Sequence, residues 1–84
     1  MTFTEVSSSQ IHSIGYDKDA EYPLGVRFHP NKKAVAEGKP FSEYHYKDVT
    51  PEMFAAFQGA ESKYRWFDAN VKDFPDAFPF VRVA

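Results

Sequence analysis

The most distinctive local pattern in the sequence is a pair of tyrosines, Tyr44 and Tyr46, separated by His45. In a strand, alternate side chains point to the same face, so the two rings are expected side by side with His45 opposite. Two neighbouring rings can form a platform on which nucleic acid bases stack. The alternative is that both rings cap the core face of a sheet and place their hydroxyls at its rim.

Side chains that could bind phosphate occur in two places. Arg27 and Lys47 lie near the tyrosine pair in the expected strands and are candidate phosphate partners. Lys63, Arg65 and Trp66 stand at the start of a predicted helix, where they could clamp an anion or stack on a base. Alternatively, that helix face is solvated and Trp66 covers part of the core. The predicted binding residues are Tyr44, Tyr46, Arg27, Lys47, Lys63, Arg65 and Trp66.

Sequence patterns of catalysis and metal binding are not found. His12, His29 and His45 lack the i, i+4 spacing of a helical metal-binding pair, and there is no cysteine to complete a site. The serines of Ser7–Ser9 do not lie in the G-x-S-x-G motif of a nucleophile elbow. The four glycines are scattered along the chain and do not form a phosphate-binding loop. We therefore expect a protein that is not an enzyme, with no catalytic residue, no metal and no cofactor.

The length and composition predict one domain over residues 1–84, with a core from about 6 to 83. Without cysteine, no disulfide can hold so short a chain together. Phe, Tyr and Trp make up 18% of the residues, and nine are Phe. Because a buried aromatic side chain removes about 150–250 Å² from water, these rings can supply the apolar core.

Net charge and hydropathy limit the classes of binding partner that we expect. The net charge is −2, which disfavours nucleic acid binding that depends mainly on phosphate electrostatics. No apolar run reaches the roughly 20 residues of a membrane span, so we expect no membrane partner. The polar start of the chain does not resemble a secretory signal, and the lack of cysteine fits a cytoplasmic location.

The first half of the chain predicts strands. Residues 10–16, 24–28 and 43–49 are rich in residues that favour strands, and Leu24, Val26 and Phe28 alternate with Gly25 and Arg27. No crossover helix lies between them, so an antiparallel meander of about three strands is expected. Residues 29–42 contain two prolines, a glycine and three lysines, which predicts a surface loop insertion with a helical turn near 32–37.

The second half predicts two helices packed on one face of the sheet. Thr50 before Pro51 is a typical helix start, and Gly59 a typical end. Ser62 can begin a second helix that runs to about Phe74. On that helix one apolar face is formed by Tyr64, Phe67, Val71 and Phe74. Residues 78–83 suggest a short C-terminal edge strand. The fold class is therefore α+β, with a core containing Leu24, Val26, Phe28, Phe54, Phe57, Phe67 and Val71.

The order of these motifs resembles the KTSC domain family, named for the C-terminus of some lysyl-tRNA synthetases. The resemblance runs from about Val6 to Val83. It rests on Val6–Ser9, Ile11, Ile14–Asp17, Leu24–Phe28, Tyr44–Tyr46, Val49–Pro51, Phe54, Phe57, Ala60, Ser62, Phe67, Val71 and Phe80.

Three departures from the family pattern concern the hairpin and the helices. Residues 29–42 are longer than the short glycine-containing turn usual in the family. Thr50 separates the usual Val-Pro pair, and Lys63-Tyr64 replaces a glycine that often follows the serine. The resemblance implies a small binding module, with RNA binding suggested by association and no catalytic residues to carry over. The leading hypothesis is a stand-alone RNA-binding module. The alternative is a protein–protein adaptor, phage-encoded and acting on a host complex.

Overall fold

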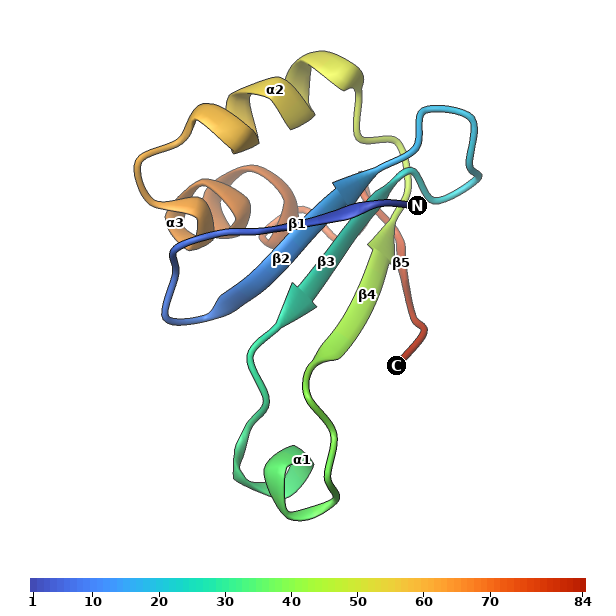
Figure 1. The fold of residues 1–84 in the computed structure, drawn as a ribbon. Coiled ribbons are helices and arrows are strands. Elements are labelled where there is room, and N and C mark those ends of the chain that lie inside the picture. The colour runs from blue at the N-terminus through green and yellow to red at the C-terminus, as the bar shows by residue number, and fades with distance from the viewer.

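An antiparallel sheet of five strands forms one layer of the domain, and the strands follow one another in sequence order (Figure 1). The computed structural model describes residues 1–84. The strands are β1 (Phe3–Glu5), β2 (Ile11–Tyr16), β3 (Leu24–Phe28), β4 (Ser42–Tyr46) and β5 (Phe80–Arg82). The three central strands confirm the predicted meander, and β5 confirms the predicted C-terminal edge strand, which the structure pairs with β4.

Strand β1 was not predicted, so the expected number of strands was too low. It pairs with β2, with Phe3 opposite Gly15. The two glycines of β2 and β3 leave the space that β1 uses: a Cβ on Gly15 would lie 2.7 Å from the backbone oxygen of Thr2, and one on Gly25 would lie 2.6 Å from the Phe3 ring. The position of β1 therefore depends on missing side chains in two other strands, which no local pattern in residues 3–5 reveals.

Two helices follow the central strands, and both begin where the sequence predicts. In α2 (Pro51–Gly59), the hydroxyl of Thr50 accepts a hydrogen bond from the backbone of Met53 at 3.2 Å. In α3 (Lys63–Phe67), Ser62 accepts one from the backbone of Arg65 at 3.3 Å. Every helix is too short or too polar to span a lipid bilayer.

The second predicted helix, which begins as α3, does not run regularly to Phe74 as expected. After Phe67 it widens into a π-helical turn, η1 (Asp68–Lys72), and then ends. Val71 stays buried on the core side, whereas Phe74 lies beyond the helix and is 52% exposed. The assignment of Phe74 to the apolar face is therefore wrong, because a periodicity of 3.6 residues does not continue through a π-helical turn and the chain that follows it.

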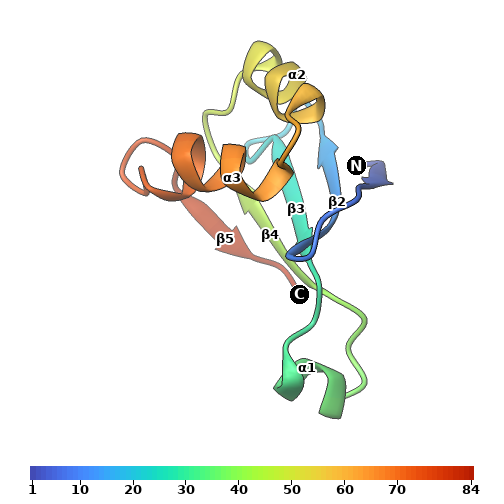
Figure 2. The same ribbon diagram turned by 90° about the vertical axis from the view of Figure 1, so that its left-hand side faces the viewer.

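Residues 29–42 form a long excursion between β3 and β4 that extends away from the sheet (Figures 1 and 2). Its helix α1 (Lys32–Ala36) begins at Asn31, whose side chain accepts a hydrogen bond from the backbone of Ala34 at 2.8 Å. The predicted helical turn is therefore present. No residue of α1 is buried, so this helix is held by its own hydrogen bonds and not by the core.

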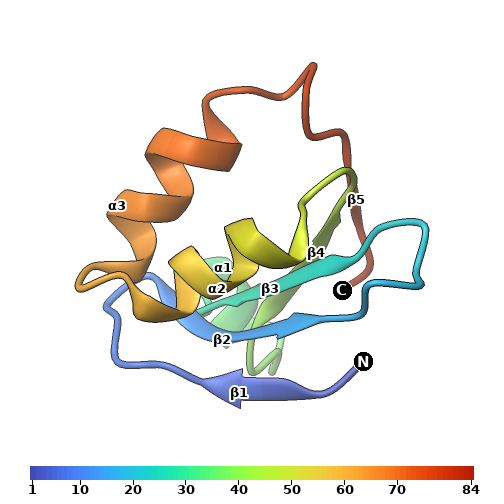
Figure 3. The same ribbon diagram turned by 90° about the horizontal axis from the view of Figure 1, so that it is seen from above.

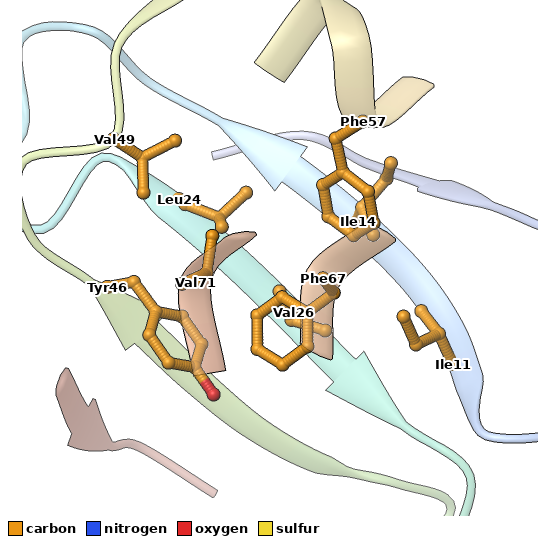
Figure 4. Close-up of a cluster of buried hydrophobic side chains, with 9 residues drawn as sticks. All are labelled: Ile11, Ile14, Leu24, Val26, Tyr46, Val49, Phe57, Phe67 and Val71. Atoms are coloured by element: carbon orange, nitrogen blue, oxygen red, sulfur yellow. The ribbon is translucent and has the colours of Figure 1, made fainter. Parts of the chain in front are cut away.

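The hydrophobic core lies between the sheet and the two helices, which cover the same face (Figure 3). Figure 4 shows Phe67 and Val71 next to Val26 and Leu24 of β3. Of the predicted core residues, Phe28 and Phe54 are only half-buried and pack against the core from its margin. The buried apolar residues are Ile11, Ile14, Leu24, Val26, Tyr46, Val49, Phe57, Phe67 and Val71.

Two phenylalanines, Phe67 in α3 and Phe74 in the chain that follows η1, provide a matched test of this core. Phe67 is fully buried, whereas Phe74 is 52% exposed. Phe67→Ala should lower the free energy of unfolding by about 3–5 kcal/mol, and Phe74→Ala should change it by no more than about 0.5 kcal/mol. Urea denaturation followed by circular dichroism measures both. Equal losses of stability for the two variants would contradict the burial that the structure assigns to them.

The glycines test how β1 is held. Gly15→Ala should destabilise the protein by about 1–3 kcal/mol, because the new methyl group meets the backbone of Thr2 and must push β1 away. Gly59 ends α2, and a Cβ at this position would meet no atom within 4 Å, so Gly59→Ala should be neutral or stabilising by up to about 1 kcal/mol. Thermal melting of both variants gives the comparison; an unchanged melting temperature for Gly15→Ala would mean that β1 does not lie against Gly15.

Candidate functional site

A pocket of about 670 Å³ opens between the sheet, the helical segment formed by α3 and η1, and the segment that leads into β5. We call it the aromatic pocket, because half of its lining residues carry phenyl or phenol rings. It is lined by Ser9, Gln10, Phe28, His29, Pro30, Tyr44, Tyr46, Tyr64, Phe67, Val71, Lys72, Pro75, Phe78 and Phe80.

The tyrosine pair of β4 forms part of the pocket wall. Tyr44 lies opposite Val26 and Tyr46 opposite Leu24, so both rings are on the core face, as their alternation predicts. Their exposure differs: Tyr46 is only 7% exposed and packs edge-on against Phe67, with ring centroids 5.1 Å apart. Tyr44 is half-buried. The pair is therefore not an open stacking platform, and Tyr44 is the ring that a ligand can reach.

Tyr44 is held by aromatic neighbours from the strands on both sides. Its ring centroid is 5.8 Å from that of Phe28 in β3 and 5.8 Å from that of Phe80 in β5, with edge-to-face geometry in both pairs. Such contacts fix the ring plane while part of the ring remains accessible from the pocket.

Arg27 lies on the opposite face of the sheet from the tyrosine pair. Its guanidinium is 3.8 Å from the centre of the Phe3 ring and 4.4 Å from that of Phe41. Its Nε donates a hydrogen bond to Glu43 at 2.6 Å, and Glu43 also accepts one from His45 at 2.7 Å. The structure therefore does not bring Arg27 to the tyrosines, because successive residues along a strand alternate between the two faces and Arg27 lies opposite Glu43, not opposite a tyrosine.

Lys47 follows β4 outside the pocket. Its ammonium is 3.7 Å from a carboxylate oxygen of Glu21 and 5.6 Å from the centre of the Tyr22 ring. It does not line the aromatic pocket, so it too is separated from Tyr44. The expected group of two tyrosines with Arg27 and Lys47 is thus not assembled.

The second predicted cluster also lies outside the pocket. Trp66 stacks on Phe57 with centroids 5.0 Å apart and an interplanar angle of 14°, which packs α3 against α2. Lys63 donates a hydrogen bond to the backbone oxygen of Ala60 at 2.6 Å, and Arg65 is exposed. These contacts support the structural interpretation of Trp66 as cover for the core.

Several pocket residues were not selected from the sequence, above all Tyr64 and Lys72. The ammonium of Lys72 donates a hydrogen bond to the Tyr64 hydroxyl at 2.9 Å. The two residues are eight positions apart, a spacing that a regular α-helix would not align, and the wider turn η1 brings Lys72 back towards Tyr64. Sequence periodicity could not reveal this pair, since it depends on the π-helical turn.

The environment of the pocket reinforces the ordinary charge states of two of its polar groups, Lys72 and Tyr46. The hydrogen bond with Tyr64 raises the pKa of Lys72, so this ammonium stays positively charged at neutral pH. Burial, with the neighbouring hydroxyls of Tyr44 and Tyr64, raises the pKa of Tyr46. That phenol therefore stays neutral, and the pocket combines aromatic walls with one cation and several hydroxyls.

The family model of the KTSC domain matches residues 7–74. The chain belongs to the KTSC domain family. The crystal structure of KTSC domain protein YPO2434 from Yersinia pestis is similar to this KTSC domain, with a TM-score of 0.74 and 30% sequence identity. The similarity covers 99% of this chain and 97% of that one. No curated protein matches the chain. The family resemblance inferred from the sequence is thereby confirmed.

The residues that carry the sequence resemblance to the KTSC family have two structural roles in this domain. Many are core residues, which explains why the resemblance predicts the fold. Seven of them also form part of the pocket wall: Ser9, Phe28, Tyr44, Tyr46, Phe67, Val71 and Phe80. The other seven lining residues lie outside the motif residues: Gln10, His29, Pro30, Tyr64, Lys72, Pro75 and Phe78.

The network on the opposite face predicts a pH dependence of stability. Burial alone would raise the pKa of Glu43, but hydrogen bonds from Arg27 and His45 outweigh burial and hold the pKa below its ordinary value of 4.5. The stability that ionised Glu43 contributes is therefore present above that value and is lost as the pH falls through the lower, folded-state pKa.

Glu43→Gln should reduce the loss of stability on acidification. Between about pH 6 and about pH 3, the free energy of unfolding should fall more for the wild type than for this variant, because only the wild type loses the Glu43 charge. The difference between the two proteins cancels the titration of all other carboxylates. Parallel curves from urea denaturation at each pH would show that Glu43 is not held ionised by its neighbours.

Proposed function

We propose that this KTSC domain is a cytoplasmic binding module that holds a base of single-stranded RNA in the aromatic pocket. The observation that carries the proposal is the composition of the pocket wall. Seven of the 14 lining residues are aromatic, namely Phe28, Tyr44, Tyr46, Tyr64, Phe67, Phe78 and Phe80. A volume of about 670 Å³ lies within the range of about 300–1,000 Å³ typical of small-molecule sites, so a nucleobase fits.

The chemistry of a base matches both parts of the pocket. The flat apolar faces of a base stack on aromatic side chains, and each such contact contributes about 1–3 kcal/mol. Its polar edge needs hydrogen-bond partners, which the hydroxyls of Tyr44 and Tyr64 and the exposed amide of Gln10 can provide at the rim. Lys72 adds a positive charge beside Tyr64. Single-stranded RNA is favoured over an RNA duplex because only an unpaired base can enter such a pocket.

The acidic balance of the chain favours stacking as the main source of affinity. With a net charge of −2, the domain can neutralise only a few phosphates. Binding should therefore depend weakly on salt, with a slope of about −0.7 for each phosphate contact to a single strand. In this arrangement Tyr44 is the central binding residue, whereas Arg27, Lys47, Lys63, Arg65 and Trp66 contribute to the fold or to the surface outside the pocket.

A second candidate function, a protein–protein adaptor, is favoured by the exposed edge of the sheet. Strand β5 pairs only with β4, and Phe80, Val81 and Val83 are 52%, 37% and 51% exposed. An unpaired strand edge with apolar side chains can accept an added strand from a partner protein. We prefer RNA because the aromatic pocket offers a shaped site with convergent hydroxyls, whereas β5 is only three residues long.

The RNA proposal is tested by titrating the protein with single-stranded RNA of about ten nucleotides and mixed sequence at low salt. Wild-type protein should bind at tens of micromolar or tighter. Tyr44→Leu should weaken binding about tenfold or more, because leucine keeps apolar bulk but removes the stacking surface. Fluorescence anisotropy of labelled RNA measures the dissociation constant.

Tyr22→Leu is the matched control, since Tyr22 is also a half-buried tyrosine but lies outside the pocket. Its affinity for RNA should equal that of the wild type. Circular dichroism and thermal melting establish that both variants are folded. Absence of binding by the wild type would reject the RNA proposal and favour the adaptor, and equal effects of the two substitutions would place the RNA site elsewhere.

A further inference from the structure

A second pocket, of about 560 Å³, adjoins the aromatic pocket on the side of the excursion. We call it the basic pocket. It lies between α1, β4 and β5, and its walls come from the excursion and from the strands next to it. It is lined by Phe28, His29, Asn31, Lys33, Ala34, Glu37, Lys39, Ser42, Tyr44 and Arg82.

The basic pocket is a cationic region on an acidic chain. Lys33, Lys39 and Arg82 line it with only one carboxylate, Glu37, so its formal charge is +2 while that of the whole chain is −2. Lysine and arginine gathered in a concave site attract anions, and a charge opposite in sign to the rest of the molecule concentrates them there.

The three cations are available to a ligand. Lys33 has no carboxylate within 4.0 Å. Lys39 pairs with Glu37 at 3.3 Å, but both side chains are more than 40% exposed, and such surface pairs contribute little. Arg82 donates from Nε to the backbone oxygen of Ala84 at 3.2 Å, which leaves its terminal guanidinium nitrogens to bind an anion.

The two pockets share one wall. Phe28, His29 and Tyr44 line both of them, and the guanidinium of Arg82 lies 5.9 Å from the centre of the Tyr44 ring. A ligand that fills both pockets must therefore carry a flat aromatic group and an anionic group on either side of Tyr44. A nucleotide unit of RNA has this combination, with a base on one side of the sugar and a phosphate on the other.

We propose that the basic pocket binds a backbone phosphate of the RNA whose base lies in the aromatic pocket. This inference rests on the proposed function and extends it to a second site. Arg82 is suited to a two-point contact with the phosphate, and Lys33 and Lys39 supply charge from the excursion. The excursion is then part of the binding site and not only an insertion on the surface.

The structure offers a matched pair of double variants to test this. Lys33→Gln/Lys39→Gln removes two charges from the basic pocket. Lys18→Gln/Lys32→Gln removes two charges from exposed lysines that line neither pocket, one of them next to Lys33 on α1. The two proteins have the same net charge, so any difference between them reports the position of the lysines.

The probe is the same single-stranded RNA of about ten nucleotides, titrated at several potassium chloride concentrations. The pocket variant should bind about tenfold more weakly or worse. Its slope of log affinity against log salt should become shallower by about 0.7 for each phosphate that it no longer binds. The affinity of the control variant for RNA should change by less than about twofold, because exposed charges outside the site act only through the screened field.

Replacing residues 31–39 with a short glycine-containing turn should repeat the effect of the pocket variant and preserve the fold.

The outcomes separate this inference from the proposed function. If the wild type binds RNA and Tyr44→Leu weakens binding, but the pocket variant matches the wild type in affinity and slope, the phosphate site is rejected while the base site stands. Equal weakening by the two double variants also rejects it, since net charge alone would explain the weaker binding. In a competition assay, nucleoside 5′-monophosphates and unlabelled RNA are compared at the same total nucleotide concentration. If the monophosphates displace the labelled RNA as well as unlabelled RNA does, an RNA chain is rejected as the source of the phosphate. No binding by the wild type rejects both proposals.

Discussion

The contact on which the rest of the structure depends is the packing of Phe57, Phe67 and Val71 from the helices onto Leu24 and Val26 of β3. Without cysteine, no covalent bridge holds the helices to the sheet. These side chains are all but fully buried, and each removes apolar surface from water that the unfolded chain would expose. Phe67 and Val71 belong both to this contact and to the wall of the aromatic pocket, so the contact also positions part of that wall.

The core and the aromatic pocket are continuous, and several residues belong to both. Phe67, Val71 and Tyr46 are buried on one side and line the pocket on the other. Apolar burial cannot be completed there, because the chain leaves the helix at η1 and crosses to β5 through a segment that is mostly exposed. A pocket with aromatic walls is thus the physical consequence of a helix that ends before it has covered the whole sheet.

The two faces of the sheet have different tasks because strand residues alternate between them. On the face away from the helices, Arg27 lies between Phe3 and Phe41 and is neutralised by Glu43, which also binds His45. A guanidinium held in this way stabilises the packing of Phe3 and Phe41 on this face and has little capacity left for a ligand. The available cations lie instead at the margin of the helix face, on the excursion and β5. Separation of the two groups lets an acidic domain present one cationic hollow beside an aromatic one.

The parts of the fold that the sequence by itself determined are those encoded by neighbouring residues. Alternation placed Leu24, Val26 and Phe28 on one face, and the side chains of Thr50 and Ser62 began the helices, because strand alternation and helix capping act over a few residues. The tertiary structure alone decided the position of β1, which needs the space left by the absence of a side chain at Gly15 and at Gly25. It also decided that Tyr46 is core while Tyr44 is accessible, and that Tyr64 meets Lys72 through a π-helical turn. Each of these depends on contacts between residues distant in sequence or on a break in periodicity, and single-sequence patterns carry no information about either.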